Sequence, residues 1–387
     1  MNTRTWAEIN LDALEHNITE IRRVTSDDAK IMSIVKADAY GHGAVECSKV
    51  LLKNGADMLG VACCNEAMQL RNAGITAPIL ILGASFEEEI EELILNDITF
   101  SLFSYEFAKR VSEIAKKNNK TARIHIKLDT GMSRIGYVTG VDDDKITEEI
   151  IKISKLDFIE IEGIFSHFAT ADEKDTEYTK LQFDRFMAVC SKLEESGLEI
   201  QIKHIANSAA IMMYPETHLD MVRAGVILYG LYPSDDVDKS RIDLKSVMSF
   251  KSRITHLKEI CDNRGVSYGK SYITSGKTKI ATIPVGYADG YTRKLSGRAK
   301  ILVNGEPMKV IGTICMDQCM IDVTSVNNIN VGDEVVIFGS KTVTADTLAS
   351  WLDTINYEIV CMISKRIPRV FSKDGRTVGT LNYLSKL

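Results

Sequence analysis

Eight short apolar runs alternate with charged, helix-like segments over roughly the first 230 residues, and this alternation constrains the fold more than any other feature. Among the intervening segments, Tyr105–Asn118 and Asp175–Glu195 show the clearest helical pattern. Such alternation favours parallel strands joined by right-handed crossovers, and eight strands favour an α/β fold of the (β/α)8 TIM-like barrel type over an open doubly wound sheet. The runs are Ile31–Lys36, Met58–Val61, Ile79–Leu82, Thr99–Leu102, Ile124–Leu128, Ile159–Phe165, Ile200–Ile205 and Leu219–Val222.

Beyond about residue 240 the pattern changes to short strands separated by turn signals such as Asn304-Gly305. We therefore expect a barrel domain over residues 1–240 and a C-terminal, mainly β domain over residues 241–387. The polar segment Ser234–Lys245 is the expected boundary. The predicted strands of the second domain are Lys279–Pro284, Ala299–Val303, Lys309–Ile314, Met320–Val323 and Glu334–Phe338.

Composition limits the classes of partner. The chain has 387 residues, of which 45% are hydrophobic and 26% charged, which fits a globular protein of two domains. A formal net charge of -6 argues against nucleic acid or an anionic membrane as the main partner. No apolar run is long enough to span a membrane, and residues 1–8 lack the apolar core of a signal peptide. We therefore expect a cytoplasmic protein.

The eight cysteines have irregular spacing and are expected to be reduced. Cys315 and Cys319 lie four apart in an apolar run, without a second pair or a nearby histidine, so we interpret them as small core residues. The seven histidines also lack metal-ligand spacing, and we expect no metal.

The peptide Val35–Gly43 places a lysine, Lys36, at the end of the first apolar run, with Tyr40 just beyond it. Barrel enzymes place their chemistry at the carboxyl ends of the strands. A lysine at such a position is a good Schiff-base nucleophile, because desolvation lowers its pKa and leaves a neutral amine. The alternative is a strand-end lysine whose ammonium group simply reaches solvent.

Polar side chains also follow the later strands of the predicted barrel. Any single one could be an ordinary rim residue, but their joint placement on one rim favours a functional site, because convergent titratable groups mark function. These residues are Arg134, His167, His204, Asn207, Ser208 and Arg223.

The end of the eighth strand adds a possible phosphate site. Gly225 and Val226 open a loop whose backbone N–H groups can point into the rim, and Ser208 can add a hydroxyl. Barrels often hold a phosphate after strands seven and eight. A Schiff-base lysine beside a phosphate site suggests pyridoxal 5'-phosphate (PLP) as the cofactor.

Taken together, these motifs closely resemble those of the alanine racemases, and the resemblance runs essentially from end to end. It implies a PLP-dependent (β/α)8 barrel with a C-terminal β domain that interconverts L-alanine and D-alanine. The matching segments are Val35–Gly43, Leu128–Gly136, Glu162–Ala171, Ala206–Ala210, Val222–Gly230, Val266–Gly269, Gly286–Gly290, Ile314–Met320 and Thr354–Ile359.

The resemblance assigns two bases and a shared site. Lys36 is similar to the lysine that binds PLP as a Schiff base and serves as one base. Tyr268 is similar to the opposing base, which reaches the site from the other subunit of a head-to-tail homodimer. The backbone of Met316 matches a substrate-carboxylate contact from that subunit. Asp317 follows it, and Tyr287 matches a tyrosine at the active-site entrance.

The remaining roles implied by the resemblance concern the cofactor. Arg223 is similar to the arginine facing the pyridine nitrogen, and Arg134 to the one near the phenolic oxygen and the substrate carboxylate. Lys127 matches a lysine that is often carbamylated and then holds Arg134, and His167 matches a link between Tyr268 and Arg223. The expected phosphate contacts are Tyr40, Ser208, Gly225, Val226 and Tyr357, and Asn207 is expected among the cofactor-binding residues.

This set of residue types suits racemisation. Bases on opposite faces remove a Cα proton from one side and return one to the other, and both must be tuned from their usual pKa near 10. An arginine at the pyridine nitrogen does not readily give up a proton, so the nitrogen stays unprotonated and side reactions are fewer. The sequence departs from the family at Asp38, where asparagine is common, and at Thr313, where arginine is common.

Three alternatives remain beside an alanine racemase that supplies D-alanine for peptidoglycan. One is a related racemase that prefers serine or a cationic amino acid. Another is a PLP-dependent decarboxylase, which would lack the combination of Arg223 with Val266–Gly269. The third is a PLP-binding barrel without enzymatic activity, against which the β domain carrying Tyr268 and Met316 argues.

Overall fold

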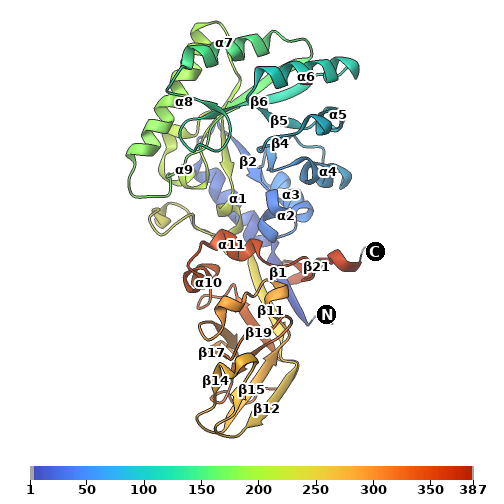
Figure 1. Ribbon diagram of the computed structural model, residues 1–387, viewed down its shortest axis with the longest axis vertical. Coiled ribbons are helices and arrows are strands. Elements are labelled where there is room, and N and C mark those ends of the chain that lie inside the picture. The colour runs from blue at the N-terminus through green and yellow to red at the C-terminus, as the bar shows by residue number, and fades with distance from the viewer. Residues whose placement is uncertain (1–3, 386–387) are drawn as a thin grey trace. The chain divides into compact units, whose positions relative to one another are not determined.

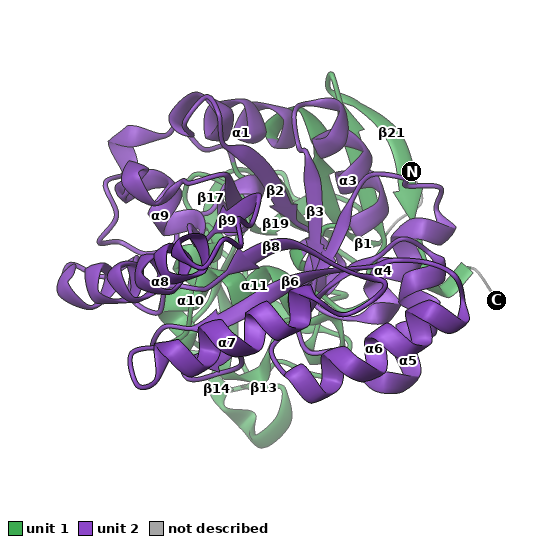
Figure 2. Cartoon of the chain, turned by 90° about the horizontal axis from the view of Figure 1, so that it is seen from above, with its two compact units in different colours: residues 1–13, 40–43, 246–387 green, residues 14–39, 44–245 purple. Residues whose placement is uncertain are grey.

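The structure is a computed structural model that describes residues 4–385, and these form two compact units (Figure 2). Unit 2 contains residues 14–39 and 44–245. Unit 1 contains the described residues up to Ala13, residues 40–43 and the described residues from Ser246 onward.

Eight parallel strands of unit 2 form a nearly closed barrel in the order β10-β2-β3-β4-β5-β6-β8-β9, which confirms the predicted fold class (Figure 1). Between β9 and β10, backbone hydrogen bonds run from Asp220 N to Lys203 O (3.2 Å) and from Arg223 N to Ala206 O (3.0 Å). The strands are β2 (Lys30–Ile34), β3 (Met58–Val61), β4 (Ile79–Ile81), β5 (Thr99–Leu102), β6 (Ala122–Asp129), β8 (Ile159–Phe165), β9 (Ile202–His204) and β10 (Met221–Ala224); β7 (Tyr137–Val138) pairs with β6.

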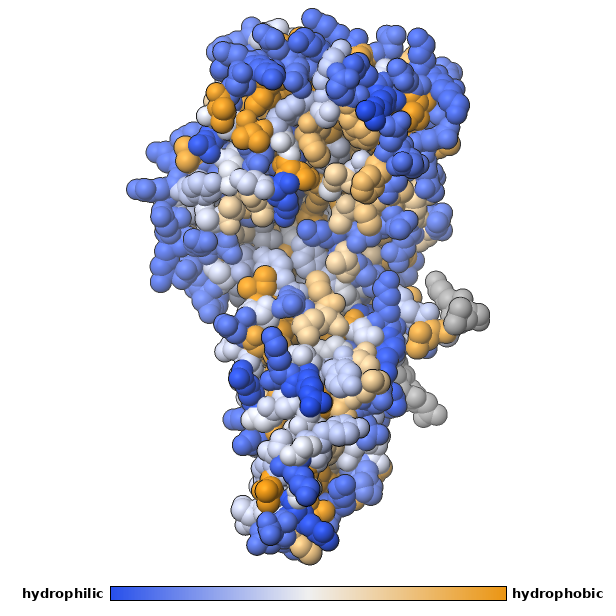
Figure 3. All heavy atoms as spheres, viewed as in Figure 1, coloured by the Kyte–Doolittle hydropathy of each residue, from blue (hydrophilic) through white to orange (hydrophobic). Residues whose placement is uncertain are grey.

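The helices of unit 2 follow the strands, and all but the short, almost fully buried α9 bury one face. In α6, Ala108, Val111 and Ala115 are buried at helical spacing, and Ser104 caps the first turn by accepting from Phe107 N (3.3 Å). The face of the molecule shown in Figure 3 is mostly hydrophilic, as amphipathic helices require. The helices are α3 (Ala44–Lys53), α4 (Cys64–Asn72), α5 (Glu87–Leu95), α6 (Tyr105–Lys117), α7 (Asp143–Ser154), α8 (Glu177–Glu195) and α9 (Ser208–Met213), and α1 (Leu11–Val24) begins in unit 1.

The first barrel strand ends earlier than predicted, and a left-handed turn follows it. The expectation that Lys36 ends the strand was wrong by two residues, because β2 ends at Ile34 and Lys36 begins α2 (Lys36–Gly41). The φ angles of the five residues after Lys36 are 52°, 56°, 54°, 53° and 81°. Left-handed backbone costs about 1–2 kcal/mol for each non-glycine residue, so surrounding contacts must hold this turn. Glu66 Oε1 accepts from Ala37 N (2.7 Å) and Asp38 Oδ1 from Ala44 N (2.9 Å).

Unit 1 contains a ten-stranded sheet in the order β12-β15-β18-β17-β16-β19-β11-β1-β20-β21. Strands lie at all five predicted places, as β15 (Thr278–Ile283), β16 (Lys300–Val303), β17 (Glu306–Ile311), β18 (Cys319–Asp322) and β19 (Glu334–Phe338). β17 begins and ends three residues earlier than predicted. The sequence analysis missed β1 (Thr5–Asn10), which pairs antiparallel with β11 (Met248–Arg253) and parallel with β20 (Arg369–Lys373). The other elements are β12 (His256–Ile260), β13 (Gly265–Val266), β14 (Tyr272–Ile273), β21 (Arg376–Leu381), α10 (Ala345–Leu352) and α11 (Asn356–Cys361).

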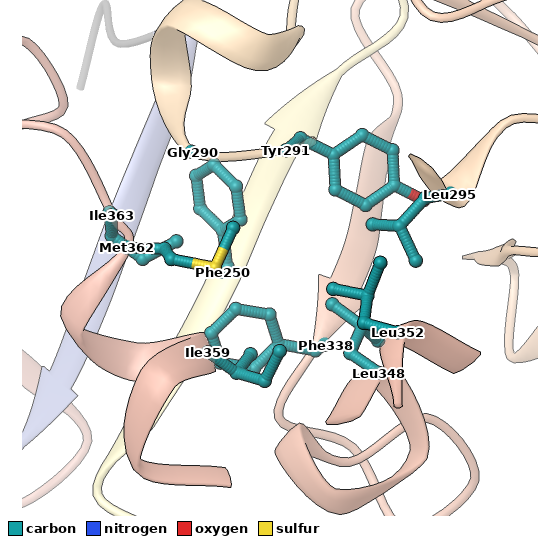
Figure 4. Close-up of a pocket in the computed structure, with 10 residues that line it drawn as sticks. All are labelled: Phe250, Gly290, Tyr291, Leu295, Phe338, Leu348, Leu352, Ile359, Met362 and Ile363. Carbon is teal, nitrogen blue, oxygen red and sulfur yellow. The ribbon is translucent and has the colours of Figure 1, made fainter. Parts of the chain in front are cut away.

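A small apolar pocket lies in the core of unit 1 (Figure 4). Phe250 on β11 and Phe338 on β19 are register partners whose ring centroids lie 5.9 Å apart. Tyr291 is fully buried at the same pocket, and its hydroxyl has no hydrogen-bond partner among residues 4–385. The remaining lining residues are Gly290, Leu295, Leu348, Leu352, Ile359, Met362 and Ile363.

In the described part of the chain, no helix has the length and apolar character needed to cross a membrane. A search of the same residues finds no group of three or more His, Cys, Asp or Glu side chains that could hold a metal ion. Cys319 is buried as a small core residue, as predicted, whereas Cys315 is only partly buried.

Candidate active site

The polar residues predicted at the barrel rim come together around His167, which follows β8. Burial is the main cause that lowers the pKa of His167 well below 6.5. The positive charges of Arg223, Arg134, Lys127 and Lys36 lower the same pKa further, in that order. The structure therefore brings four basic side chains, each from a predicted site position, within electrostatic range of His167.

Arg223, on β10, is only 3% exposed and is held by both terminal nitrogens. Its Nη1 donates to His204 Nδ1 (2.9 Å) and to His204 O (3.1 Å). Its Nη2 donates to His167 Nδ1 (3.1 Å) and to the carbonyl oxygens of Ser166 (2.6 Å) and Ile205 (2.9 Å). The Nε–H donates to no acceptor among residues 4–385, so the guanidinium group is fixed with one donor left over.

The hydrogen bond from Arg223 also sets the proton position of His167. A guanidinium group can only donate, so His167 Nδ1 must accept and the neutral ring carries its proton on Nε2. That Nε2–H has no acceptor within the described residues. His167 is therefore a neutral donor rather than a general base in this structure.

Lys127, on β6, is 4% exposed, and its amine is unusually easy to deprotonate. Burial lowers the pKa of Lys127 to about 7, and the charges of Arg223 and Arg134 contribute, against the opposing effect of Asp129. Its Nζ donates to the carbonyl of Leu128. The surroundings of Lys127 thus favour the neutral amine.

Arg134 lies in the loop after β6 and is exposed. Asp129, at the end of β6, shapes this loop because its Oδ1 accepts from Gly131 N (3.0 Å) and Ser133 N (2.9 Å). Tyr178 on α8 donates its hydroxyl to Gly131 O (2.7 Å). The loop therefore carries Arg134 on a fixed backbone while its side chain stays open to solvent.

The predicted phosphate site has a different donor pattern from the one expected. In this structure the Gly225 N–H donates to Ser208 Oγ (3.0 Å). The serine hydroxyl proton and the Val226 N–H have no acceptor in the described structure. Asn207 caps α9, since its Oδ1 accepts from Ala210 N (3.0 Å). Two donors, one from a hydroxyl and one from the backbone, remain for a ligand.

Two predicted cofactor tyrosines lie together in unit 1. The rings of Tyr40 and Tyr357 are 6.1 Å apart at an angle of 52°. Burial, assisted by Tyr357, raises the pKa of Tyr40, so its hydroxyl remains protonated. The carbonyl of the next residue, Gly41, accepts from Arg369 Nε (2.9 Å), which ties the end of the left-handed turn to β20.

The predicted second base belongs to an exposed surface of unit 1. Tyr268 is 66% exposed, Met316 52% and Tyr287 43%, which is high for side chains of this size. Their segments are hydrogen-bonded together: Thr313 Oγ1 donates to Tyr268 O (3.1 Å) and Tyr287 N to Cys315 O (3.1 Å). We call these three residues the Tyr268 surface.

Backbone geometry at Ser267 and Gly312 fixes the segments that carry the Tyr268 surface. Ser267 has a φ of 64°, and a side chain on Gly312 would meet Val266 O and Ser267 Cβ at 2.8 Å, so Gly312 permits this close approach. Asp317 is held by Arg366, whose Nη2 lies 2.8 Å from its Oδ1. Arg366 also contacts the buried Asp289 at 2.6 Å.

His204 was predicted only as a residue at a strand end, and no role was predicted for His125 or Glu162. His204 Nδ1 accepts a hydrogen bond from Arg223 Nη1, and His125 Nδ1 lies 2.8 Å from His204 Nε2. The available signal was the spacing of His125 and Lys127 on one strand, since residues two apart share a face.

Comparison with known proteins agrees with this architecture. The family model "Alanine racemase, N-terminal domain" matches residues 9–233, and "Alanine racemase, C-terminal domain" matches residues 247–371. The alanine racemase of Clostridium tetani is 50% identical over 383 residues, which cover 98% of each chain. The alanine racemase of Methanococcus maripaludis is 51% identical over 369 residues, covering 95% of this chain and 98% of the relative.

A solved structure of alanine racemase from Clostridium difficile 630 superposes with a TM-score of 0.96 at 48% identity, covering 99% of this chain and 100% of the other. The fold and the rim thus define a barrel protein with a basic site and an appended β unit. The chain belongs to the alanine racemase family, as the sequence motifs indicated.

Proposed function

We propose that this chain is an amino-acid racemase that interconverts L-alanine and D-alanine with PLP. The observation that carries the proposal is the cluster of Lys36, Lys127, Arg134 and Arg223 around His167 at the rim of the barrel. The relatives and the solved structure described above are all alanine racemases, which does not favour a preference for serine or a cationic amino acid. Nor does it favour a decarboxylase or a cofactor-carrying barrel.

The donors of the rim fit PLP. An unprotonated pyridine nitrogen is an acceptor, and Arg223 Nε–H is the one guanidinium donor that lacks an acceptor within the described chain. A phosphate group needs donors, and Ser208 and Val226 each retain one. We propose further phosphate contacts from the Gly225 N–H and from the Tyr40 and Tyr357 hydroxyls. Asn207 would act by capping α9.

When bound, PLP supplies an electron sink that makes the Cα proton of the substrate acidic. Lys36 would hold the cofactor covalently and move a proton at one face of Cα, and Tyr268 would do so at the other. His167, as a neutral Nε2–H donor beside Arg223, would stabilise the deprotonated hydroxyl of Tyr268. Arg134 and the backbone of Met316 would bind the substrate carboxylate, with Asp317 and Tyr287 beside them.

We further propose that Lys127 is carbamylated. A neutral, buried amine with a pKa of about 7 is the form that reacts with carbon dioxide. The product would be an anion among Arg223, Arg134 and the ring of Phe165, over which Lys127 Nζ lies at 5.3 Å from the centroid. An anion there would pair with Arg134 and orient it.

We also propose a homodimer with shared sites, in which the Tyr268 surface meets the barrel of the partner subunit. The exposure of Tyr268, Tyr287 and Met316 supports this, because large side chains exposed together are typical of contact surfaces. Domains over residues 1–240 and 241–387, a cytoplasmic location and the supply of D-alanine for peptidoglycan belong to the same proposal.

Purified protein supplied with PLP should be tested by a chiral assay against L-alanine, L-serine and L-lysine. We expect D-alanine to form fastest. Faster conversion of serine or lysine would replace the substrate assignment, and release of carbon dioxide without a D-amino acid would indicate a decarboxylase. Borohydride should fix the cofactor on the peptide that contains Lys36, and labelling of another lysine would overturn that role.

A further inference from the structure

We propose that Glu162 is a positioning residue for Arg223, acting through His125 and His204, which form a relay below the rim. Its effect on catalysis rests on the proposed function, whereas the proton positions in the relay do not.

The relay is continuous across four strands of the barrel. Arg223 Nη1 on β10 lies 2.9 Å from His204 Nδ1 on β9. His204 Nε2 lies 2.8 Å from His125 Nδ1 on β6, and His125 Nε2 lies 3.1 Å from Glu162 Oε2 on β8. Thr99 on β5 donates its hydroxyl to the same carboxylate oxygen at 3.2 Å.

The chemistry of the two ends fixes the direction of every hydrogen bond. The guanidinium group only donates, so His204 accepts at Nδ1 and carries its proton on Nε2. That proton is donated to His125 Nδ1, so His125 also carries its proton on Nε2. The carboxylate of Glu162 only accepts, and it receives this last proton. One arrangement of protons therefore satisfies all four groups.

The barrel is built around this relay. Both imidazole rings are fully buried, and His204 stacks on Phe165 with centroids 4.9 Å apart and rings 6° from parallel. Gly163 lies opposite His125 in the β6–β8 register, and a Cβ there would meet the His125 ring at 2.6 Å. The sheet therefore has a residue without a side chain where this imidazole needs room.

The relay connects opposite charges through neutral rings. Burial lowers the pKa of His125 and, together with Arg223, lowers the pKa of His204 well below 6.5. The hydrogen bond from His125 is the main cause that lowers the pKa of Glu162, so its carboxyl group stays ionised. Glu162 is 23% exposed on its side chain, which places the anionic end near solvent and the cationic end at the rim.

The consequence falls on Arg223. Without Glu162, the His125 Nε2–H would lose its acceptor, so the proton arrangement that serves Arg223 would lose the hydrogen bond that favours it over the reversed arrangement. In the reversed arrangement, His125 donates from Nδ1 to His204 Nε2, and the His204 proton lies on Nδ1, where it faces the Nη1–H donor of Arg223. Two donors cannot bond, so Arg223 would lose this contact and the orientation of its Nε–H in that fraction of molecules.

The proton positions can be measured on the purified protein labelled with 15N-histidine, by long-range 1H–15N correlation of the ring nitrogens. Signals of the seven histidines would be assigned by single substitutions. We expect neutral rings protonated on Nε2 for both His125 and His204. A proton on Nδ1 of either ring would overturn the inference, whether or not the protein racemises alanine.

Three variants then separate positioning from general packing. Glu162→Leu removes the acceptor and should shift both histidines away from the single Nε2–H form. It should lower kcat by about tenfold, the lower end of the range known for groups that orient metal ligands. Glu162→Gln retains an oxygen acceptor and should restore both the proton positions and most of kcat. Glu160→Gln is the matched control, an exposed glutamate two residues earlier on β8.

The outcomes are distinguishable. Unchanged proton positions and kcat in a folded Glu162→Leu variant would overturn the inference. If Glu162→Leu does not fold, the wild-type spectrum and Glu162→Gln still decide it. If the proton positions are as expected but the protein does not racemise alanine, the proposed function is wrong and the inference about the relay stands.

Discussion

The barrel rim carries one proposed base, Lys36, and the Tyr268 surface carries the other. The two regions differ in how deeply their side chains are buried and in what holds them. At the rim, Arg223 is 3% exposed and five hydrogen bonds fix its terminal nitrogens. On the Tyr268 surface, the tyrosine is 66% exposed, and the contacts that hold its segment go to the backbone.

The proposed function assigns a different half of the site to each unit. The rim is already organised for a ligand, because its donors and protons are set by buried partners. The Tyr268 surface is organised only in its backbone, so its side chains need a second surface to be desolvated. Each of the following predictions tests one side of that contrast.

The largest effect is expected for Tyr268→Phe, which leaves the rim intact. Solvent-deuterium exchange at Cα should persist from D-alanine through Lys36 and collapse from L-alanine, because loss of a positioned base costs about 10²–10⁴-fold. NMR of the recovered alanine measures both directions. Equal loss in both, with cofactor still bound, would indicate a single-base mechanism.

Acid should lower the free energy of unfolding through the three buried histidines of the barrel. The pKa values of His125, His167 and His204 are lowered by burial, so unfolding adds protons to these rings below their ordinary pKa of about 6.5. Stability is therefore retained above pH 6.5 and lost as pH falls, by up to about 1.4 kcal/mol per pH unit for each ring.

Urea unfolding at pH 7.5 and pH 5.5 measures this slope. His256→Gln is the control, since His256 is exposed and its replacement should leave the slope unchanged. A midpoint that does not change between the two pH values would contradict the burial of three neutral histidines.

The smallest effect compares two buried tyrosines, one from each unit. Tyr229 donates its hydroxyl to Ile34 O (2.9 Å), whereas the hydroxyl of Tyr291 has no partner within the described residues. Tyr229→Phe should lower the free energy of unfolding by about 1 kcal/mol, and Tyr291→Phe should leave it unchanged or raise it. A larger loss for Tyr291→Phe would mean that its hydroxyl has a partner, such as a buried water.

Much of the fold follows from the sequence, because apolar runs mark buried strands. The last apolar run stops at Val222, and β10 extends to Ala224 with Arg223 buried. Hydropathy alone does not indicate the partners that make this burial possible. The pairing of β1 with β11 was missed for a related reason: it joins residues about 240 positions apart.

The site shows the same limit. Strand ends and family motifs identified His167 and the basic residues Lys36, Arg134 and Arg223, which lie within electrostatic range of it. They did not identify Glu162, because its role depends on two buried rings from other strands. Nor did they show that the Gly225 N–H donates a hydrogen bond to Ser208 Oγ, because this bond depends on local geometry.

The shared site is tested most directly by mixing Lys36→Ala and Tyr268→Phe subunits under conditions of proven exchange. Each variant alone should be nearly inactive. In a head-to-tail dimer, random mixing gives one intact site in half of the dimers, so about a quarter of the wild-type activity should return. No recovery despite exchange would show that Lys36 and Tyr268 act within one subunit, and would contradict the division of the site between the rim and the Tyr268 surface.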